Sequence, residues 1–181
     1  MLGIRLTFNR SPLKGLIAHS SLEWFWEAAE VTGVPVMILA PEQLDQIGEL
    51  APRHPGLRLI IDHLGLTPHK VYESLDAHVG VLCALARYPN VGVKASALPC
   101  SVAEEFPFPS LRGPVSRVIA QFGADRVFWG SDLTRLPCTY GQWVRYFTEE
   151  LELGPTELRL VMGKALMEWL RWGDESLGRP S

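Results

Sequence analysis

The chain has 181 residues, of which 47% are hydrophobic, so it is long enough for one globular domain with a substantial apolar core. Its net charge of -3 comes from 17 basic and 20 acidic residues without long runs of one sign, which argues against nucleic acid or an anionic membrane as a partner. Three cysteines without a CxxC pair, and no signal-like or membrane-length apolar segment, favour a cytoplasmic protein rather than a disulfide scaffold.

Short apolar runs alternate with helical segments along the chain. Ser21 can cap the first helix, and Gly33 can end it. The expected strands cover residues 3–8, 34–39, 57–61, 91–95 and 126–129, and the expected helices cover 22–31, 41–51, 70–87, 111–122, 140–151 and 155–169. Nearly continuous apolar strands that alternate with helices predict a parallel sheet covered on both faces. We expect one domain over residues 1–172 and a frayed tail over 173–181.

Polar side chains follow the last three predicted strands at the point where each strand ends. Asp62 and His63 follow the third strand, Lys94 and Ser96 lie at the end of the fourth, and Asp132 follows the fifth. The carboxyl ends of parallel strands are where α/β folds build their sites, so these groups could converge on one pocket. A lysine in an apolar strand needs a partner or a substrate anion. A turn or cap role for Asp132 and a packing role for His63 are the alternatives.

Three segments carry a resemblance to a known family. Leu59-Ile-Ile-Asp-His-Leu-Gly65, Pro89-Asn-Val-Gly-Val-Lys-Ala-Ser96 and Arg126-Val-Phe-Trp-Gly-Ser-Asp132 resemble the last three strands of the amidohydrolase-related (amidohydrolase 2) family of (β/α)₈ TIM barrels. That family includes metal-dependent hydrolases, aromatic-acid decarboxylases and sugar or dicarboxylate lactonases. Residues 3–6, 33–39 and 155–170 are similar to its fourth strand, fifth strand and closing helix. The resemblance implies an α/β fold, a partial barrel that covers about strands 4 to 8.

The resemblance also implies roles for individual residues. Asp132 would bind a metal or take a proton from the attacking water, and His63 would touch the metal or the substrate. Lys94 and Arg5 match positions that could contact a substrate anion, and we add Ser96 as a further substrate-binding candidate because it ends the same strand as Lys94. The implied cofactor is a divalent metal such as zinc, held by Asp132 and His63 if it is bound at all.

Two departures from the family pattern weaken the expectation that a metal is bound. The His-x-His pair belongs to a first strand that this sequence does not contain, and residues 37–40 offer no fifth-strand histidine. Lys164 also stands where the family commonly has asparagine. Residues 37–44 are closer to the lactonase-like branch, some members of which work without a tightly held metal.

These residues predict a hydrolase acting on a small carboxylated substrate. A lone carboxylate is a modest base, so a lactone or ester is an easier target than an amide. The alternatives are a metal-dependent decarboxylase, a non-catalytic barrel remnant that acts as an interaction subunit, and a doubly wound binding domain. Five strands cannot close a barrel that typically takes about 250 residues. The chain is then the C-terminal part of a longer hydrolase, which is our first interpretation, a split barrel completed by another copy (a homo-oligomer) or by a second chain, or an open sheet. We expect exposed strand edges and poor solubility as a monomer.

Overall fold

A computed structural model of the chain describes residues 2–172 and shows one parallel sheet of five strands. The strands are β1 (Ile4–Thr7), β2 (Val36–Leu39), β3 (Leu59–Ile61), β4 (Val91–Ser96) and β5 (Val127–Gly130), and they lie side by side in chain order. The predicted tail over 173–181 lies outside the described residues. Within the described part, no helix has the length and apolar character needed to cross a membrane.

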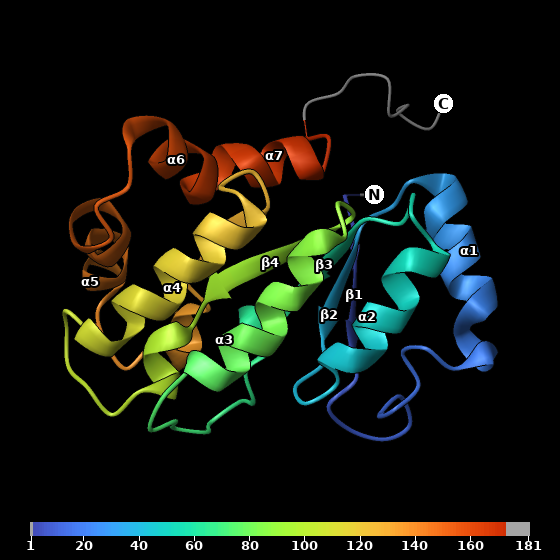
Figure 1. The fold of residues 1–181 in the computed structure, drawn as a ribbon, viewed down its shortest axis with the longest axis horizontal. Coiled ribbons are helices and arrows are strands. Elements are labelled where there is room, and N and C mark those ends of the chain that lie inside the picture. Colours follow the sequence, from blue (N-terminus) through green and yellow to red (C-terminus); the bar gives the residue numbers. More distant parts are fainter. Residues whose placement is uncertain (1, 173–181) are drawn as a thin grey trace.

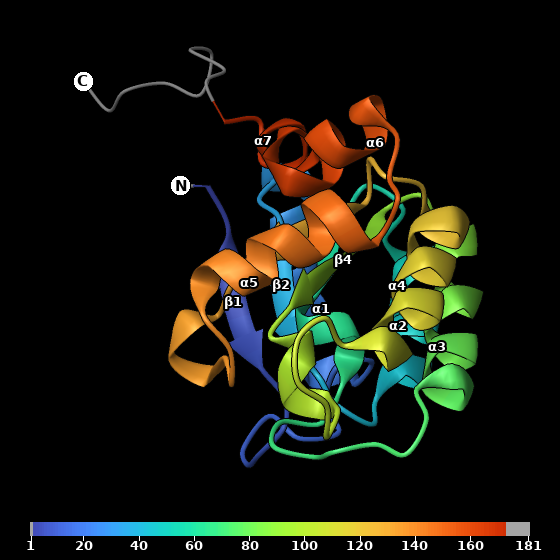
Figure 2. The same cartoon turned by 90° about the vertical axis from the view of Figure 1, so that its left-hand side faces the viewer.

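Strand order determines where the helices lie. When each strand pairs with the next in the chain, right-handed crossovers place every connecting helix on the same face. These helices are α1 (Glu23–Thr32), α2 (Leu44–Arg53), α3 (Asp76–Cys83) and α4 (Pro109–Phe122), and Figures 1 and 2 show α2, α3 and α4 together on one side of the sheet. A doubly wound sheet would reverse its strand order, so that alternative is wrong.

The two faces of the sheet differ because successive strand residues point to opposite sides. Val36, Ile38, Leu59, Ile61, Val91, Val93 and Val127 point toward the helices and are fully buried in one large core. On the other face Met37, Ile60 and Phe128 form a second, smaller cluster with side chains from residues 160–170. The helix-covered face therefore forms the main hydrophobic core, and the second face can accommodate a functional site.

The chain's last helices follow β5. They are α5 (Tyr140–Arg145), α6 (Pro155–Arg159) and α7 (Ala165–Trp169), and the stretch from Leu160 packs against the starts of the strands. The rings of Phe128 and Trp169 lie 5.6 Å apart between centroids. The expected helical cover on both faces is thus met by the α1–α4 layer on one face, and on the other by this segment along the strand starts alone.

Several expected helices differ in extent. The helix expected over 41–51 begins at Leu44, and the one expected over 140–151 is α-helical to Arg145 and then π-helical over Tyr146–Glu150. The helix expected over 70–87 begins at Asp76, whose N–H donates to the Ser74 hydroxyl at 3.1 Å, and its α-helical part ends at Cys83. The helix expected over 155–169 is interrupted by a π-helical turn, Leu160–Lys164, in which Gly163 has a non-helical backbone. This interruption separates α6 from α7.

Candidate active site

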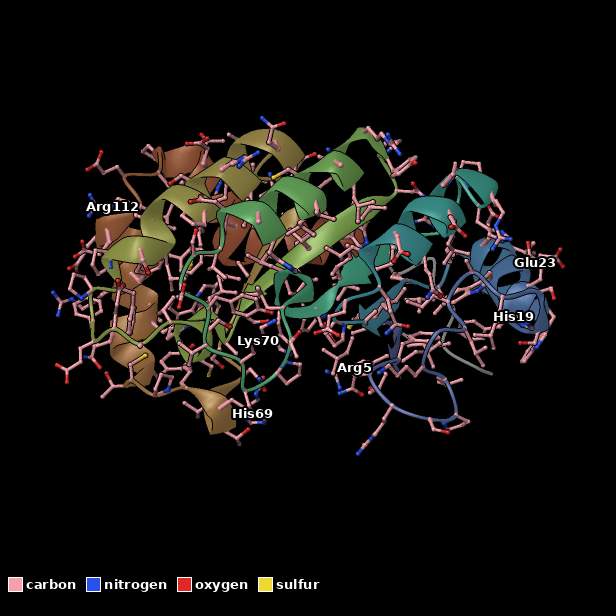
Figure 3. The ribbon with its side chains drawn as sticks, turned by 60° about the horizontal axis from the view of Figure 1, so that its bottom comes forward. Arg5, His19, Glu23, His69, Lys70 and Arg112 are labelled. Atoms are coloured by element: carbon pink, nitrogen blue, oxygen red, sulfur yellow. The ribbon has the colours of Figure 1, made fainter. Side chains whose placement is uncertain are left out.

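A cavity of about 340 Å³ lies at the carboxyl ends of the strands, on the face of the sheet opposite α1–α4. It is lined by Arg5, Asp62, His63, Lys94, Ser96, Trp129, Gly130, Asp132 and Leu166. Arg5 comes from β1, Lys94 and Ser96 come from β4, and Leu166 of α7 forms part of the wall. Figure 3 shows Arg5 at this edge of the molecule. The prediction that the strand-end residues share one pocket is confirmed.

His63 and Asp132 meet in this cavity from different strand ends. The Nε2 atom of His63 lies 3.6 Å from an Asp132 carboxylate oxygen. The other ring nitrogen, Nδ1, lies 2.8 Å from the Ser96 hydroxyl and 3.3 Å from the Ser96 carbonyl oxygen. Ser96 was expected to touch substrate, but its visible contact is with His63, which it orients.

Both residues occupy left-handed backbone. His63 has φ of 52° and Asp132 has φ of 48°. Non-glycine residues pay strain for this conformation, and it is found at positions that aim a side chain. The sharp turn after each strand is what brings the imidazole and the carboxylate over the same cavity.

Asp62 is the residue that sequence reasoning did not select. Its side chain is 1% exposed and lies between two cations: Oδ2 accepts from Arg5 Nε at 2.6 Å, and Oδ1 lies 2.8 Å from Lys94 Nζ. Burial alone would raise the pKa of this carboxyl, but Lys94 and then Arg5 outweigh it and hold the pKa below its usual value. Lys94 in an apolar strand was the available signal, since a buried ammonium demands such a partner.

This contact refines the picture of Lys94 and Arg5. Both were predicted as possible contacts of a substrate anion, with a protein partner as the alternative for Lys94, and each gives one contact to Asp62. Lys94 also lies 3.2 Å from the Met37 sulfur, and its side chain is 21% exposed, while 49% of the Arg5 side chain remains exposed. Their role as anion contacts stays a prediction, with Arg5 the more accessible of the two.

Burial has the largest influence on the protonation state of His63, and nearby charges modify it. Burial, the largest influence, lowers its pKa, and Arg135 lowers it further, while Asp62, Asp132 and the Ser96 backbone raise it. The net direction is downward, so the imidazole is neutral at pH 7.

Arg135 is a second residue that sequence reasoning missed. Its Nη1 lies 3.3 Å from the Asp132 carboxylate, three residues earlier in the same turn. The thiol of Cys100 donates to the Arg135 carbonyl oxygen, which ties this turn to the loop after β4. Arg135 and His63 therefore both contact the same oxygen of Asp132, Oδ2. An arginine three residues after a strand-end aspartate was the only signal.

The metal expectation can be tested against the donor atoms. A structural or catalytic zinc site uses at least three protein ligands. Residues 2–172 contain no group of three or more His, Cys, Asp or Glu side chains that could hold a metal ion. His63 and Asp132 are a pair, and the Asp62 oxygens are engaged by Arg5 and Lys94. The donor set that this part of the chain provides does not fit a complete zinc site.

Comparisons with known proteins agree with this architecture. A family model described as Amidohydrolase matches residues 2–166. The L-fucono-1,5-lactonase of Burkholderia ambifaria is 34% identical over 136 residues, which are 70% of this chain and 46% of that protein.

Solved structures show the same fold. A zinc-bound amidohydrolase from Burkholderia multivorans superposes with a TM-score of 0.80 at 19% identity, covering 93% of this chain and 64% of its own. A putative 2-pyrone-4,6-dicarboxylic acid hydrolase from Pseudomonas putida gives 0.74 at 21%, covering 94% and 63%. The chain therefore spans less than two thirds of the length of these relatives, and its open sheet corresponds to part of a TIM barrel.

Proposed function

Because the chain belongs to the amidohydrolase family, we propose that it carries the water-activating half of a hydrolase site that opens a small carboxylated lactone or ester. The observation that carries the proposal is the placement of His63 and Asp132 over one cavity, 3.6 Å apart. The lactonase among the relatives supports a lactone as the substrate class.

The water site follows from hydrogen-bond roles. The Ser96 carbonyl can only accept, so we assign the proton of neutral His63 to Nδ1, which leaves Nε2 as an acceptor. Nε2 then faces a carboxylate oxygen of Asp132, which is also an acceptor. Two acceptors at this separation repel unless a donor lies between them. A water molecule can give one hydrogen to each and present its oxygen to a substrate carbonyl.

Asp132 is the proposed general base. It takes the proton as the water attacks, and it can return that proton to the departing alkoxide. A carboxylate is a modest base, and an amine is a poorer leaving group than an alkoxide, so an ester or lactone is the favoured target. Arg135 holds the Asp132 carboxylate in place, because its guanidinium Nη1 lies 3.3 Å away.

Arg5 and Lys94 supply the positive charge. Around the cavity three cations (Arg5, Lys94 and Arg135) face two carboxylates, while His63 is neutral, so the site carries one surplus positive charge. This surplus suits a carboxylated substrate and a developing oxyanion. The side chain of Arg5 is about half exposed, so Arg5 is better placed than Lys94 to bind a carboxylate in a bidentate manner.

A substrate panel tests the proposal. An active preparation, either this chain alone or this chain with the segment that completes its barrel, is assayed by chromatography for the ring-opened product of lactones with and without a carboxylate and of matched lactams. We expect turnover of the carboxylated lactone and none of the lactam. Equal turnover of lactam and lactone, or no preference for the carboxylated compound, would overturn the proposed chemistry. The metal-dependent decarboxylase alternative gains no support from the donor atoms described above.

The open sheet also leads to a proposal about partners. β1 and β5 have a neighbour on one side each within the sheet, so each presents an edge. We propose that a further segment or a second copy adds strands at these edges and closes the cavity. The three cysteines are all free, which supports a reducing, cytoplasmic location.

A further inference from the structure

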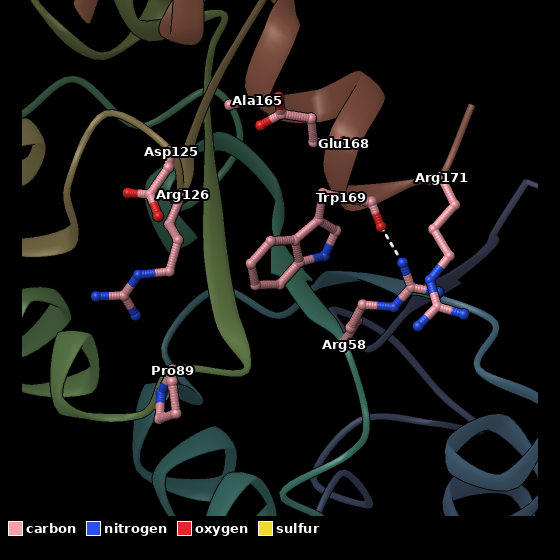
Figure 4. A pocket seen from close by; sticks show the side chains of 8 residues that line it. All are labelled: Arg58, Pro89, Asp125, Arg126, Ala165, Glu168, Trp169 and Arg171. Atoms are coloured by element: carbon pink, nitrogen blue, oxygen red, sulfur yellow. Dashed lines mark hydrogen bonds between the residues drawn. The ribbon is translucent and has the colours of Figure 1, made fainter. Parts of the chain in front are cut away.

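A second cavity, of about 490 Å³, lies where the strands begin, at the opposite end of the sheet from the candidate active site (Figure 4). Arg58 and Arg126 enter it just before β3 and β5, and Trp169 and Arg171 come from α7 and the residues after it. The proposed hydrolysis uses none of these side chains.

Arg58 and Arg171 form a pair of like charges. An Nη atom of each lies 3.8 Å from the point where a Cβ on Gly33 would stand, so both guanidinium groups border the same spot. Arg58 donates to the carbonyl oxygens of Trp169 and Gly33, which fixes it between the ends of α7 and α1. Within residues 2–172 neither guanidinium has a carboxylate within salt-bridge distance. Two cations held together in this way attract a shared anion.

Trp169 adds a donor at the same place. Its indole nitrogen is buried and has no hydrogen-bond partner among the described residues. Figure 4 shows this nitrogen on the side of the ring that faces Arg58 and Arg171. A buried N–H without an acceptor costs about 1–3 kcal/mol, which an acceptor atom of a ligand would recover.

The acidic residues of the cavity lie elsewhere. Asp125 stands beside Arg126, across the indole from the arginine pair (Figure 4). Glu168 lies 3.3 Å from the ammonium of Lys164 and is engaged there. The corner formed by Arg58, Arg171 and Trp169 is therefore made of donors.

We propose that this corner, Arg58–Trp169–Arg171, binds a small oxyanion such as phosphate or a carboxylate. Its oxygens accept from the two guanidinium groups and from the indole N–H. The anion thereby joins the end of α1, the start of β3 and the end of α7. Because Leu166 of α7 also lines the candidate active site, the bound anion stabilises the segment that forms that wall.

The indole N–H of Trp169 is a direct reporter. The chain contains six tryptophans, so a ¹⁵N-labelled full chain gives six indole signals, and Trp169→Phe identifies the one of interest. Inorganic phosphate is titrated at constant ionic strength against chloride, and acetate is titrated in parallel. We expect a saturable downfield shift of the Trp169 signal, because the indole N–H gains an acceptor.

Two variants complete the test. Arg171→Gln removes one guanidinium from an exposed backbone position and should weaken phosphate binding by about tenfold, the loss expected for one charge-assisted hydrogen bond. Arg159→Gln removes an exposed arginine from α6, outside the cavity, and should leave the affinity unchanged. The proposal is overturned if the Trp169 signal does not saturate, if Arg171→Gln binds as the wild type does, or if the Trp129 signal in the other cavity is the only one to move.

Discussion

Nε2 of His63 lies 3.6 Å from the Oδ2 atom of Asp132, and each of the two side chains has a further neighbour of its own. Ser96 fixes the imidazole through Nδ1, and Arg135 holds the carboxylate through Nη1. The gap between them is too wide for a strong direct hydrogen bond and suits a shared water. This arrangement makes the two residues separable by mutation.

Asp132→Asn should abolish turnover while leaving the fold intact. The amide cannot accept the proton of the attacking water, so kcat should fall by about 10²- to 10⁴-fold. Asparagine is the right substitute because it tolerates the left-handed φ of 48° at this position. Activity is measured by proton release, and folding is measured by circular dichroism and thermal unfolding.

The matched control for this experiment is Asp125→Asn, which changes a carboxylate in the other cavity. Its kcat should equal that of the wild type. If Asp132→Asn keeps full activity in a preparation that is active beforehand, Asp132 is not the base.

Asp62→Asn should destabilise the chain strongly. The change removes the buried negative charge that lies 2.6 Å from Arg5 and 2.8 Å from Lys94 and leaves Lys94 without its partner. Breaking a buried ion pair in this way costs about 3–5 kcal/mol, and the exposure of Arg5 places the expected loss near the lower end. Urea unfolding gives the free energy directly.

The comparison for Asp62 is an exposed pair. Lys164→Gln breaks the contact with Glu168, in which both side chains are about half exposed, and should cost less than about 1 kcal/mol. Similar losses for the two variants would mean that Asp62 is not the anchor of the cavity.

The sequence was sufficient to predict the parallel sheet and the end at which the site lies. Apolar strands bounded by turns determine the first, and polar residues just after β3, β4 and β5 indicate the second. The partner was harder to predict: Lys94 was expected to need either a protein partner or a substrate anion, and the structure places it in the cavity with Asp62 as that partner. The register between strands decides which cation pairs with which carboxylate. A single sequence does not specify this register.

The helix boundaries that sequence reasoning missed have local causes. The chain turns at Ser74, which accepts from the Asp76 N–H, so α3 begins later than the apolar pattern suggested, and Gly163 interrupts the helical stretch that begins at Pro155. Arg135 was missed because a polar residue in a short turn looks like any solvated loop residue. Its contact with Asp132 depends on the left-handed backbone of Asp132. Among residue types, only glycine indicates such a conformation in a sequence.

Stability should fall as the pH drops below neutrality, because His63 resists protonation in the folded chain. Burial lowers its pKa below the ordinary value of 6.5. The unfolded chain therefore binds the proton first, and stability is lost as the pH falls from about 7 through 6.5 toward the folded-state pKa. Asp62 has the same sign in a more acidic window: its folded pKa lies below 3.8, so its contribution is present above that value and disappears as the carboxyl protonates.

His63→Asn isolates the first of these effects. Asparagine accepts the left-handed φ of 52° and does not titrate in this range. The urea midpoint of the wild type should decrease between pH 7 and pH 5.5, and that of His63→Asn should change less. An identical slope in the two proteins would show that another group causes the loss.

Arg126→Met should destabilise the sheet at the end opposite the candidate active site. The guanidinium donates to the carbonyl oxygens of Ala86, Tyr88, Val91 and Phe122, which join α4 and the loop before β4 to β5. Methionine keeps the apolar stem but leaves these acceptors without a donor, for an expected loss of about 3 kcal/mol. Arg159→Met, at an exposed position, should change stability by about 0.5 kcal/mol or less. Equal effects of the two changes on the free energy of unfolding in urea would show that the hydrogen bonds of Arg126 do not stabilise this end of the sheet.

Self-association should depend on α1, the helix beside the free edge at β1. Trp24 and Val31 on this helix are 67% and 87% exposed, and β1 pairs with β2 on one side alone. Apolar side chains next to an open strand edge favour docking of a further strand and helix. Sedimentation velocity of the isolated chain should therefore show concentration-dependent association, which Trp24→Glu reduces. Val81→Glu is the control, because Val81 is 57% exposed on α3, whose preceding strand β3 has neighbours on both sides. A chain that stays monomeric at all concentrations and melts sharply, or equal effects of the two substitutions, would show that the β1 edge is not the surface at which the sheet is extended.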